Sequence, residues 1–571
     1  MSPKRPFLAF LAVFLITSAV SANRPNVLLI VCDDLNDYVE SLGGHPQTKT
    51  PNIAKLAKSG VSFTQAHCNI PICNPSRASF ATGIYPHNSG HFGFEPWNEN
   101  EVLKNSHTMM TFFASHGYHT LGTGKVMHGH DKGEWQEYGH PSDYGPFLFD
   151  GNEKLPHLGT PSPFRDDFGV IDGTFGPLEK VSHKFSPKTG KAYSWMTGGW
   201  KKQRAMKYES EEDRDPTGDE LNAQWAIRRL QELAVSKSEK PFFMGVGFIR
   251  PHTPLIVPQK YFDLFPLDEI KLPKIKKGDA LDTFKHTVTS DEDDRGGDRG
   301  TKMFDSLVAS YGGDRELALK KFIQAYLASV ASVDDLVGEV LDTLAQTGLD
   351  KDTIVIFTSD HGWGNGEKDY LYKNSLWQES TRIPLIVRVP EGTTKGGECD
   401  QPVSLIDLFP TLVELCELPG NTLKNEKGLP LDGFSLKPIL EDPENGKWQG
   451  PDYVITALYK WAHHYDPGQQ SYSLRFKDWR YIRYENEKEE LYHTTEDDHE
   501  WNNLAMNPEY SDRLTEFRKK LLSIIPQSKP DKALSNNKWK DLYFKKNPQA
   551  DTNKDGRLSW PEFKAHKNTK K

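Results

Sequence analysis

Short apolar runs that stop abruptly at polar residues punctuate the first two thirds of the chain. They are rich in β-branched and aromatic side chains, and they cover residues 26–32, 119–122, 241–249 and 353–358. Continuous runs suit strands that are buried on both faces of a parallel sheet, whereas half-exposed strands alternate apolar with polar positions. The pattern therefore predicts a central, mostly parallel sheet.

Helical patterns lie between these runs. One helix is expected between residues 50 and 60. Thr50 looks like its N-cap, Pro51 like a first-turn proline and Gly60 like the glycine that ends it. A much longer helical pattern covers residues 316–346. Because strands that alternate with helices are typical of α/β folds, we expect an α/β sandwich.

Two stretches break this alternation. Residues 130–215 are rich in glycine, proline, tyrosine and tryptophan and show little periodicity. We interpret them as a loop-rich insertion over the carboxyl edge of the sheet. Residues 285–300 are dense in charge and glycine, which predicts an exposed, mobile loop.

The pattern changes near residue 450. Apolar runs at 472–476, 479–484 and 490–493 are separated by charged turns and predict a small antiparallel sheet, and a helix is expected over 510–525. We divide the chain into a signal peptide, a catalytic domain, a smaller α+β subdomain, a polar linker and a last segment. Their expected bounds are 1–22, 23–445, 446–526, 527–538 and 539–571.

The first residues predict export. Lys4 and Arg5 precede an apolar run that ends in the small residues Val20, Ser21 and Ala22, which is typical of a secretory signal peptide. No later stretch approaches the ~18 apolar residues of a membrane span. The chain has no Asn-x-Ser/Thr glycosylation site, which favours a bacterial periplasmic or extracellular protein over a lysosomal one.

Composition narrows the picture further. The net charge of -9 gives no overall attraction to nucleic acid or to anionic membranes. Aromatic residues make up 11% of the chain, which fits either stacking on sugars or a large aromatic core. An odd number of cysteines in an exported protein leaves at least one without an intramolecular partner. The five are Cys32, Cys68, Cys73, Cys399 and Cys416.

Residues able to bind metals and anions follow four of the predicted strands. They are Asp33 and Asp34, Lys125 and His128, His252, and Asp360 and His361. In open α/β sheets, ligands bind outside the carboxyl ends of the strands. Taken singly, each group also fits a solvated turn or a helix cap. Together, three carboxylates and an imidazole suit Ca²⁺ or Mg²⁺, and the lysines and histidines suit sulfate or phosphate.

One cysteine lies in a distinctive stretch, residues 73–83, which reads CNPSRASFATG. It resembles the C-x-P-S-R…T-G signature of type I sulfatases, in which the cysteine is oxidised to formylglycine. Residues 123–128, 250–254, 326–330 and 359–363 are most similar to the iduronate 2-sulfatase branch. The resemblance covers about residues 24–510 and implies an alkaline-phosphatase-like sandwich. His361 is itself a feature of the branch, because most sulfatases have asparagine there.

The resemblance also implies a mechanism. Residue 73, as hydrated formylglycine, attacks sulfur and forms a covalent sulfate ester, and its second hydroxyl then allows sulfate to be eliminated. The Ca²⁺ ligands would be Asp33, Asp34, Cys73, Asp360 and His361, with Mg²⁺ the less favoured ion. A formylglycine-generating enzyme would be a partner during maturation.

Further roles follow from the same resemblance. Arg77 would stabilise the hydrated aldehyde, and Lys125 and Lys373 would neutralise the sulfate oxygens. His128 would act as the base and His252 as the acid for the leaving sugar oxygen. Two residues have structural alternatives, since His252 also fits a capping residue and Lys373 a solvated helix lysine. Trp363 could stack on sugar or pack against the metal loop, and Pro75 is expected to begin a helix aimed at the anion.

The last segment carries a second calcium motif, because residues 551–562 match the twelve-residue EF-hand loop. Its ligands would be Asp551, Asn553, Asp555, Arg557, Ser559 and Glu562. Pro548 interrupts the incoming helix and a second loop is missing from the sequence, so we expect a stabilising or docking role for the bound Ca²⁺.

These features predict an exported, Ca²⁺-dependent sulfatase that acts on a sulfated carbohydrate, with a uronic-acid-containing polysaccharide favoured by the branch. Two alternatives remain open. A phosphonate or phosphodiester hydrolase can share the fold and the modified cysteine. A non-catalytic, calcium-dependent carbohydrate-binding protein could use the aromatic residues and the EF-hand loop.

Overall fold

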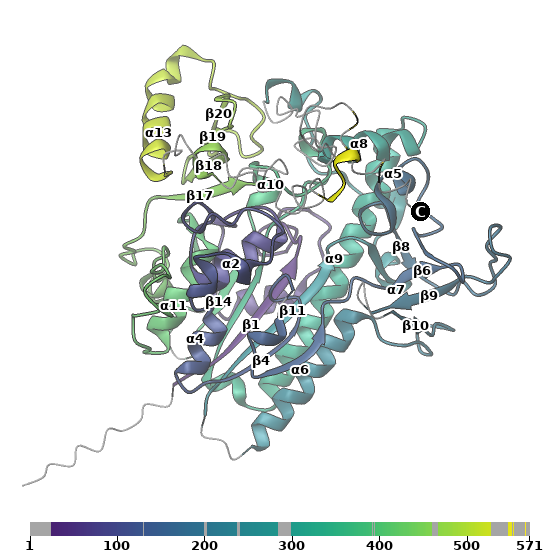
Figure 1. Ribbon diagram of the computed structural model, residues 1–571, viewed down its shortest axis with the longest axis horizontal. Helices are drawn as coiled ribbons and strands as arrows, with labels where there is room; N and C mark the ends of the chain where they lie inside the picture. Colours follow the sequence, from purple (N-terminus) through teal and green to yellow (C-terminus); the bar gives the residue numbers. More distant parts are fainter. Residues whose placement is uncertain are drawn as a thin grey trace, which may run out of the picture.

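A computed structural model describes residues 24–129, 131–198, 203–236, 240–283, 299–390, 392, 394–459, 466–526, 546–550, 552 and 566. At its centre lies a sheet with the strand order β15-β2-β14-β13-β1-β11-β4-β5 (Figure 1). The bounds are β1 Asn26–Asp33, β2 Val61–Phe63, β4 His119–Gly124, β5 Glu137–Pro141, β11 Phe242–Pro251, β13 Thr353–Ser359, β14 Leu385–Arg388 and β15 Gly397–Cys399. Only β14 runs antiparallel to its neighbours, so the expected mostly parallel sheet is confirmed.

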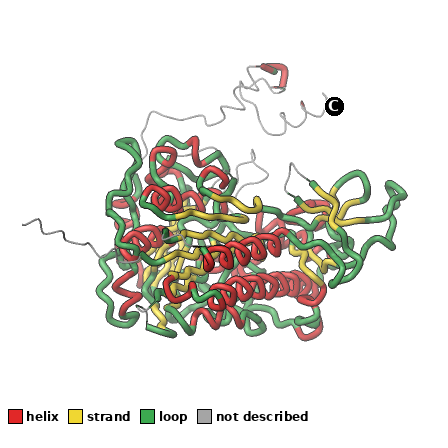
Figure 2. The backbone as a smooth tube through the Cα atoms, turned by 90° about the horizontal axis from the view of Figure 1, so that it is seen from below, coloured by secondary structure: helices red, strands yellow, loops and turns green. Residues whose placement is uncertain are grey.

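Helices cover both faces of this sheet. The α-helices of the described residues are α1 Pro51–Ala57, α2 Cys73–Thr82, α3 Pro86–Ser89, α4 Met109–Ser115, α5 Phe164–Asp172, α6 Gly218–Val235, α7 Gln259–Phe262, α8 Arg299–Ser310, α9 Arg315–Gln346, α10 Gln378–Thr381, α11 Leu408–Leu415, α12 Lys437–Glu441 and α13 Ser511–Ile524. The long helices α6 and α9 pack side by side on one face (Figure 2). None of the helices in the described ranges is long and apolar enough to cross a membrane.

Strand β1 shows why its sequence is continuously apolar. Leu28 and Ile30 point into the core that α6 and α9 cover, while Leu29 and Val31 point into the core that α2, α4 and α11 cover. All four side chains are fully buried. Burial on both faces removes the need for polar positions along the strand.

The helix expected after Thr50 is present, but its capping differs from the prediction. The Thr50 hydroxyl accepts the backbone N–H of Glu40 at 2.8 Å rather than capping α1. The first-turn N–H groups of Asn52 and Ile53 instead donate to the carboxylate of Asp334, at 3.1 and 2.9 Å. Because Asp334 lies in α9, the N-terminus of α1 is held by tertiary contact, which a local pattern does not reveal.

The insertion at residues 130–215 contains more regular structure than expected. β10 (Arg204–Met206), β9 (Ser194–Thr197), β6 (Phe147–Phe149) and β7 (Lys154–Leu155) form a second sheet, and β8 (Phe175–Leu178) pairs with β12 (Leu255–Pro258). The strands escaped prediction because they have only two to four residues each, too few to show a period.

The C-terminal part forms the expected antiparallel sheet, β17 (Tyr453–Leu458), β18 (Ser471–Phe476), β19 (Trp479–Arg483) and β20 (Glu489–His493), with α13 beside it (Figure 1). The sequence missed β17 and predicted the other three strands and the helix within one residue of their observed starts. Two further short strands, β3 (Ala66–His67) and β16 (Val403–Ser404), pair with each other.

Several predicted features lie outside the described residues, namely the signal peptide, the linker, all six EF-hand ligands and most of the expected mobile loop. Residues 299 and 300 of that loop already belong to α8. The domain bounds stay predictions. All five cysteines are described, and each is a buried, free thiol.

The buried Arg480 side chain forms an ion pair within the C-terminal part and ties its sheet to the main domain. The Arg480 guanidinium on β19 pairs with Glu500, and its Nη1 donates to the carbonyl oxygen of Leu376 at 3.0 Å. We expect Arg480→Ala to lower the free energy of unfolding by about 3–5 kcal/mol, because it leaves a buried carboxylate unpaired. Arg483→Ala is the matched control on the same strand, since its partner Glu487 is exposed, and it should cost at most about 1 kcal/mol. Equal losses in urea denaturation would contradict this account.

Candidate active site

The carboxyl ends of four neighbouring strands bring the predicted site residues together. Asp33 ends β1, Asp360 follows β13, His252 follows β11 and Lys125 follows β4. These strands lie side by side in the order β13-β1-β11-β4, and all four side chains are buried. The sequence thus predicted correctly that these groups share one edge of the sheet.

A close approach of two backbones holds Lys125 in this edge. Gly124 ends β4 with a φ of 73°, and a Cβ atom built on it would lie 1.9 Å from the carbonyl oxygen of Gly247 in β11. Only glycine therefore fits at position 124. The tight turn places Lys125 over β11 and next to the carboxylates.

Helix α2 brings the stretch around Cys73 to the same edge. It begins at Cys73 rather than at Pro75, because the Ser76 N–H already donates to the carbonyl oxygen of Ile72 at 3.1 Å. The fixed φ of proline is compatible with the first turn, so Pro75 sits inside it instead of opening it. The Ser76 hydroxyl donates to the backbone oxygen of Asp360 at 2.6 Å and fixes the helix against β13.

Arg77 joins the helix to the carboxylates. Its Nε lies 2.8 Å from Asp360 Oδ2 and its Nη2 lies 3.5 Å from Asp33 Oδ1, and the whole side chain is buried. Burial alone would lower the pKa of the guanidinium, but the two carboxylates outweigh it and raise the pKa. Arg77 is thus a permanent cation at the base of the site.

The Cys73 sulfur lies between a cation and an imidazole. Its Sγ is 3.2 Å from Lys373 Nζ and 3.4 Å from His361 Nε2. Burial nevertheless raises the pKa of the thiol, so at neutral pH the side chain is the protonated, weakly nucleophilic form. An unmodified thiol is poorly suited to attack an ester here.

The predicted metal ligands form two overlapping clusters. Atoms of Asp33, Cys73, Asp360 and His361 lie within 4.8 Å of one another, and so do atoms of Asp33, Asp34, Cys73 and His252. Asp33 Oδ1 is buried without a hydrogen-bond partner in the described part of the chain. A buried carboxylate oxygen of this kind, within an oxygen-rich set, fits a hard divalent cation such as Ca²⁺ or Mg²⁺.

Asp34 reaches the site through a rare backbone conformation. Its φ is 65°, in the left-handed region that few side chains other than Asn and Asp adopt. The Tyr326 hydroxyl donates to the Asp34 carbonyl oxygen at 2.7 Å, and the Asp34 N–H donates to Asp360 Oδ1 at 3.3 Å. Tyr326 belongs to one of the branch-like stretches, and this contact gives it a physical role.

The two lysines pair with the first two aspartates. Lys125 Nζ contacts Asp33 Oδ2, and Lys373 Nζ lies 2.9 and 3.2 Å from the two oxygens of Asp34. Burial raises the pKa of Asp34, whereas the cations around Asp33, Lys125 first, outweigh burial and hold its pKa well below the usual range. Lys373 is buried, so the interpretation as a solvated helix lysine was wrong.

The two histidines differ in exposure. His252 is buried, its Nδ1 contacts the backbone oxygen of Thr253, and its Nε2 lies 3.8 Å from Asp34 Oδ2. His128 is partly exposed and packs edge-on against Phe94 at 5.3 Å. Burial, reinforced by nearby lysines, lowers the pKa of His252 well below its usual range and that of His128 to about 3. Both rings are therefore neutral at neutral pH.

Sequence reasoning missed one aromatic residue at the site. Tyr144 comes from the 130–215 insertion, and its ring centre lies 5.0 Å from Lys125 Nζ and 5.1 Å from the ring of His252. Arg250 Nη2 donates to the carbonyl oxygens of Tyr144 and Gly145, at 3.3 and 3.1 Å, which fixes the loop. Trp363, by contrast, is buried and stacks on Phe322, so it packs in the core and cannot stack on a sugar.

If the protein has the activity that the resemblance implies, we expect Tyr144→Ala to lower its kcat/KM by about tenfold, because a partly desolvated cation–π contact contributes about 1–2 kcal/mol to the placement of Lys125. Tyr144→Phe keeps the ring and should stay within about threefold of the wild type. Steady-state kinetics of the two variants check this. If Tyr144→Phe fell as far as Tyr144→Ala, the ring face would not be the reason for the loss.

Comparison with known proteins places these residues in a family. Residues 25–418 match the sulfatase family model, and residues 366–527 match the model "N-sulphoglucosamine sulphohydrolase, C-terminal". A sulfatase of Formosa agariphila is 31% identical over 86% of this chain and 85% of its own length. Mouse iduronate 2-sulfatase is 30% identical over 69% of both chains.

Solved structures agree on the fold. An enzyme in complex with its substrate D-glucosamine-2-N,6-O-disulfate has a TM-score of 0.62 at 19% identity, covering 88% of this chain and 97% of its own. A phosphonate monoester hydrolase of Agrobacterium radiobacter has a TM-score of 0.60 at 21% identity, covering 88% and 95%. Fold alone does not separate these two activities. The family match and the curated relatives named as sulfatases show that the chain belongs to the sulfatase family, whose enzymes hydrolyse sulfate esters.

Proposed function

We propose that this sulfatase removes sulfate from a carbohydrate, with residue 73 acting as formylglycine beside a bound Ca²⁺. The substrate class follows from relatives: one is named iduronate 2-sulfatase, and solved neighbours include a 2-O glycosaminoglycan sulfatase and an enzyme bound to a disulfated glucosamine. A sulfated uronic acid or another residue of a sulfated polysaccharide is the substrate that these relatives favour. The predicted signal peptide would direct the enzyme out of the cytoplasm, to the bacterial periplasm or beyond.

The observation that carries the proposal is the setting of Cys73. A buried thiol with a raised pKa lies within 3.4 Å of both Lys373 and His361 and shares a cluster with two aspartates. These groups do little for a neutral thiol, but they suit an oxygen nucleophile that must lose a proton next to cations. Conversion of the thiol to a hydrated aldehyde by a formylglycine-generating enzyme supplies that oxygen.

The metal ligands would be Asp33, Asp34, residue 73, Asp360 and His361, and a divalent cation held there lowers the cost of ionising the hydrated aldehyde. Arg77 holds Asp33 and Asp360 in position for this task and adds a fixed positive charge. Oxygen ligands outnumber nitrogen, which suits a hard divalent cation. Ca²⁺ is the favoured ion because it tolerates an irregular ligand set, whereas Mg²⁺ demands near-ideal octahedral geometry.

The lysines select the anion. The site contains three carboxylates and three cations, so their charges cancel. The carboxylates are those of Asp33, Asp34 and Asp360, and the cations are Arg77, Lys125 and Lys373. A divalent cation would make this balance positive and so attract a sulfate ester. Lys125 and Lys373 are then the donors that meet the sulfate oxygens as negative charge develops.

The histidines move the protons. His252 reaches the site from β11 and would protonate the departing sugar oxygen, because a sulfate group beside it stabilises the imidazolium and raises its pKa. Neutral His128, partly exposed at the rim, would accept the proton from the second hydroxyl of residue 73.

Rates on two small substrates test the reaction class. We expect aryl sulfate to be hydrolysed at least about a hundredfold faster than an aryl phosphodiester or phosphonate monoester, and the reverse preference would favour the rival hydrolase. Product analysis on defined sulfated oligosaccharides then identifies the sugar and the position of the sulfate. A Cys73→Ala protein that kept its biological role would revive the carbohydrate-binding alternative.

A further inference from the structure

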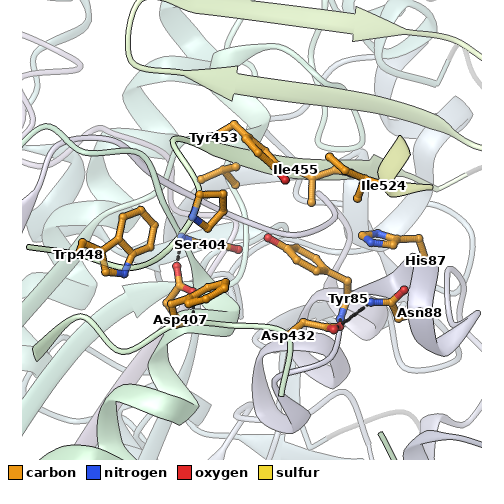
Figure 3. A pocket seen from close by; sticks show the side chains of 13 residues that line it. Tyr85, His87, Asn88, Ser404, Asp407, Asp432, Trp448, Tyr453, Ile455 and Ile524 are labelled. Atoms are coloured by element: carbon orange, nitrogen blue, oxygen red, sulfur yellow. Dashed lines mark hydrogen bonds between the residues drawn. The ribbon is translucent and has the colours of Figure 1, made fainter. Parts of the chain in front are cut away.

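A second cavity lies at the far end of α2, where the main domain meets the C-terminal sheet (Figure 3). Its volume of about 210 Å³ equals the space of about seven water molecules and suits one sugar-sized ring. Helix α2 runs from Cys73 to Thr82, so the cavity begins about 15 Å from the active site along the helix axis. It is therefore a separate site, and the catalytic chemistry does not explain it.

Aromatic side chains form much of its wall. Tyr85 points into the middle of the cavity and faces Tyr453 of β17, while Trp448 and His87 lie at opposite ends (Figure 3). The rings of Tyr85 and His87 stack at 4.8 Å with an angle of 22°. Flat aromatic faces with a few fixed polar groups are typical of pockets that bind small organic ligands.

His87 supplies a polar group. It is only 4% exposed and lines the cavity, and the contacts of its ring within the residues that the structure describes are to the rings of Tyr85 and Tyr472. Burial lowers the pKa of His87 to about 4, so the neutral ring presents one N–H donor and one acceptor. Because His87 lines the cavity, a ligand or water in it can supply these hydrogen-bond partners.

Two aspartates supply fixed acceptors. Asp407 accepts the backbone N–H groups of Ser404 and Phe434, both at 2.8 Å, and Asp432 accepts the backbone N–H of Tyr85 at 2.7 Å. Each carboxylate keeps further lone pairs for other donors. Asp407 ends the short 3-10 helix Leu405–Asp407, and the proposed reaction gives it no role.

The charge of the cavity limits its ligand. Its described lining contains these two carboxylates and neither lysine nor arginine. A sulfated or carboxylated sugar would therefore be repelled. An ammonium ion would be attracted, but burial raises the pKa of Asp407 to about 7, which weakens that attraction. An ammonium group also offers only donors, whereas His87 needs an acceptor for its N–H as well as a donor for its second nitrogen.

We infer that this cavity binds one neutral, hydroxylated sugar ring, as a carbohydrate-binding site separate from the catalytic centre. Hydroxyl groups both donate and accept hydrogen bonds, so they satisfy the aspartates and His87 together, and the sugar ring packs on the aromatic faces. The inference goes beyond the proposed function, since binding needs neither residue 73 nor a metal. Within that function, the site would hold an unsulfated part of the polysaccharide.

Saturation-transfer NMR on the full-length protein tests this site with methyl β-D-galactopyranoside and N-acetyl-D-glucosamine as neutral probes. Glucuronic acid, galactose 6-sulfate and tetramethylammonium are the charged probes. We expect at least one neutral sugar to bind, at least tenfold more tightly than every charged probe. His87→Ala and Trp448→Leu should each weaken that binding at least tenfold, while His107→Ala, a histidine elsewhere that contacts Phe112, should leave it unchanged.

Hydrolysis of a small aryl sulfate separates this inference from the proposed function. His87→Ala and Trp448→Leu should hydrolyse it within twofold of the wild type, because neither residue reaches the catalytic centre. Failure of both neutral sugars to bind the wild type, tighter binding of a charged probe, or undiminished binding in both variants would each overturn the inference. A wild type that binds the sugar but leaves aryl sulfate intact would overturn the proposed function alone.

Discussion

Cys73→Ala should reduce aryl sulfate hydrolysis by at least about 10⁴-fold while the protein still folds, because the substitution removes the atom that attacks sulfur. The side chain is small and buried, and its two nearest polar neighbours, Lys373 and His361, keep contacts with Asp34. We therefore expect a loss in kcat, with at most a small change in melting temperature. Stopped assays at high enzyme concentration reach the required sensitivity.

Cys68→Ala is the matched control. Cys68 is equally buried and only five residues earlier, but its sulfur contacts the backbone oxygen of Ser380 at 3.7 Å and lies outside the metal cluster. Removal of the Cys68 sulfur leaves a small void, so the free energy of unfolding should fall somewhat while kcat stays unchanged. Retention of more than a tenth of the wild-type rate by Cys73→Ala would show that residue 73 is not the nucleophile.

Asp360→Asn should lower kcat by about 10³-fold, because it removes one negative charge from the metal cluster without changing the shape of the side chain. In the wild type, the Asp360 carboxylate also pairs with Arg77 and accepts the backbone N–H of Asp34. The side-chain amide that the substitution introduces must occupy the same two positions. A second readout is the rise in melting temperature that Ca²⁺ causes, which should disappear. Measuring it in a Glu562→Gln background removes the contribution expected from the EF-hand loop.

Asp334→Asn provides the comparison for this variant. Asp334 is a buried aspartate that receives the N–H groups at the start of α1, far from the cluster. We expect it to lower the free energy of unfolding by about 1–3 kcal/mol and to leave kcat and the Ca²⁺ response intact. If both aspartate variants lost activity to the same degree, general destabilisation rather than metal binding would explain the loss.

Local sequence predicted the sheet well because its signal is strong. Strand β1 is a continuous apolar run, and the abrupt change to Asp33 and Asp34 marks its carboxyl end. Since parallel strands share one carboxyl edge, the residues at the strand ends can be grouped from their sequence positions alone. The long helix α9 was equally clear, because 32 residues show their period plainly.

The remaining features depend on contacts between distant segments. Thr50 has the residue type of an N-cap, but Asp334 takes over the capping from a helix almost three hundred residues away. Tyr144 reaches the site because Arg250 binds the loop through backbone oxygens, which any residue type could supply. The neutral state of His252 follows from burial, which its sequence context does not show.

Mass spectrometry of the peptide that contains residue 73, taken from fully active enzyme, tests the central claim most directly. The account predicts that the cysteine sulfur is gone and that an aldehyde stands in its place, detectable as an adduct with a hydrazine. An intact, alkylatable thiol at that position in material of full specific activity would contradict it.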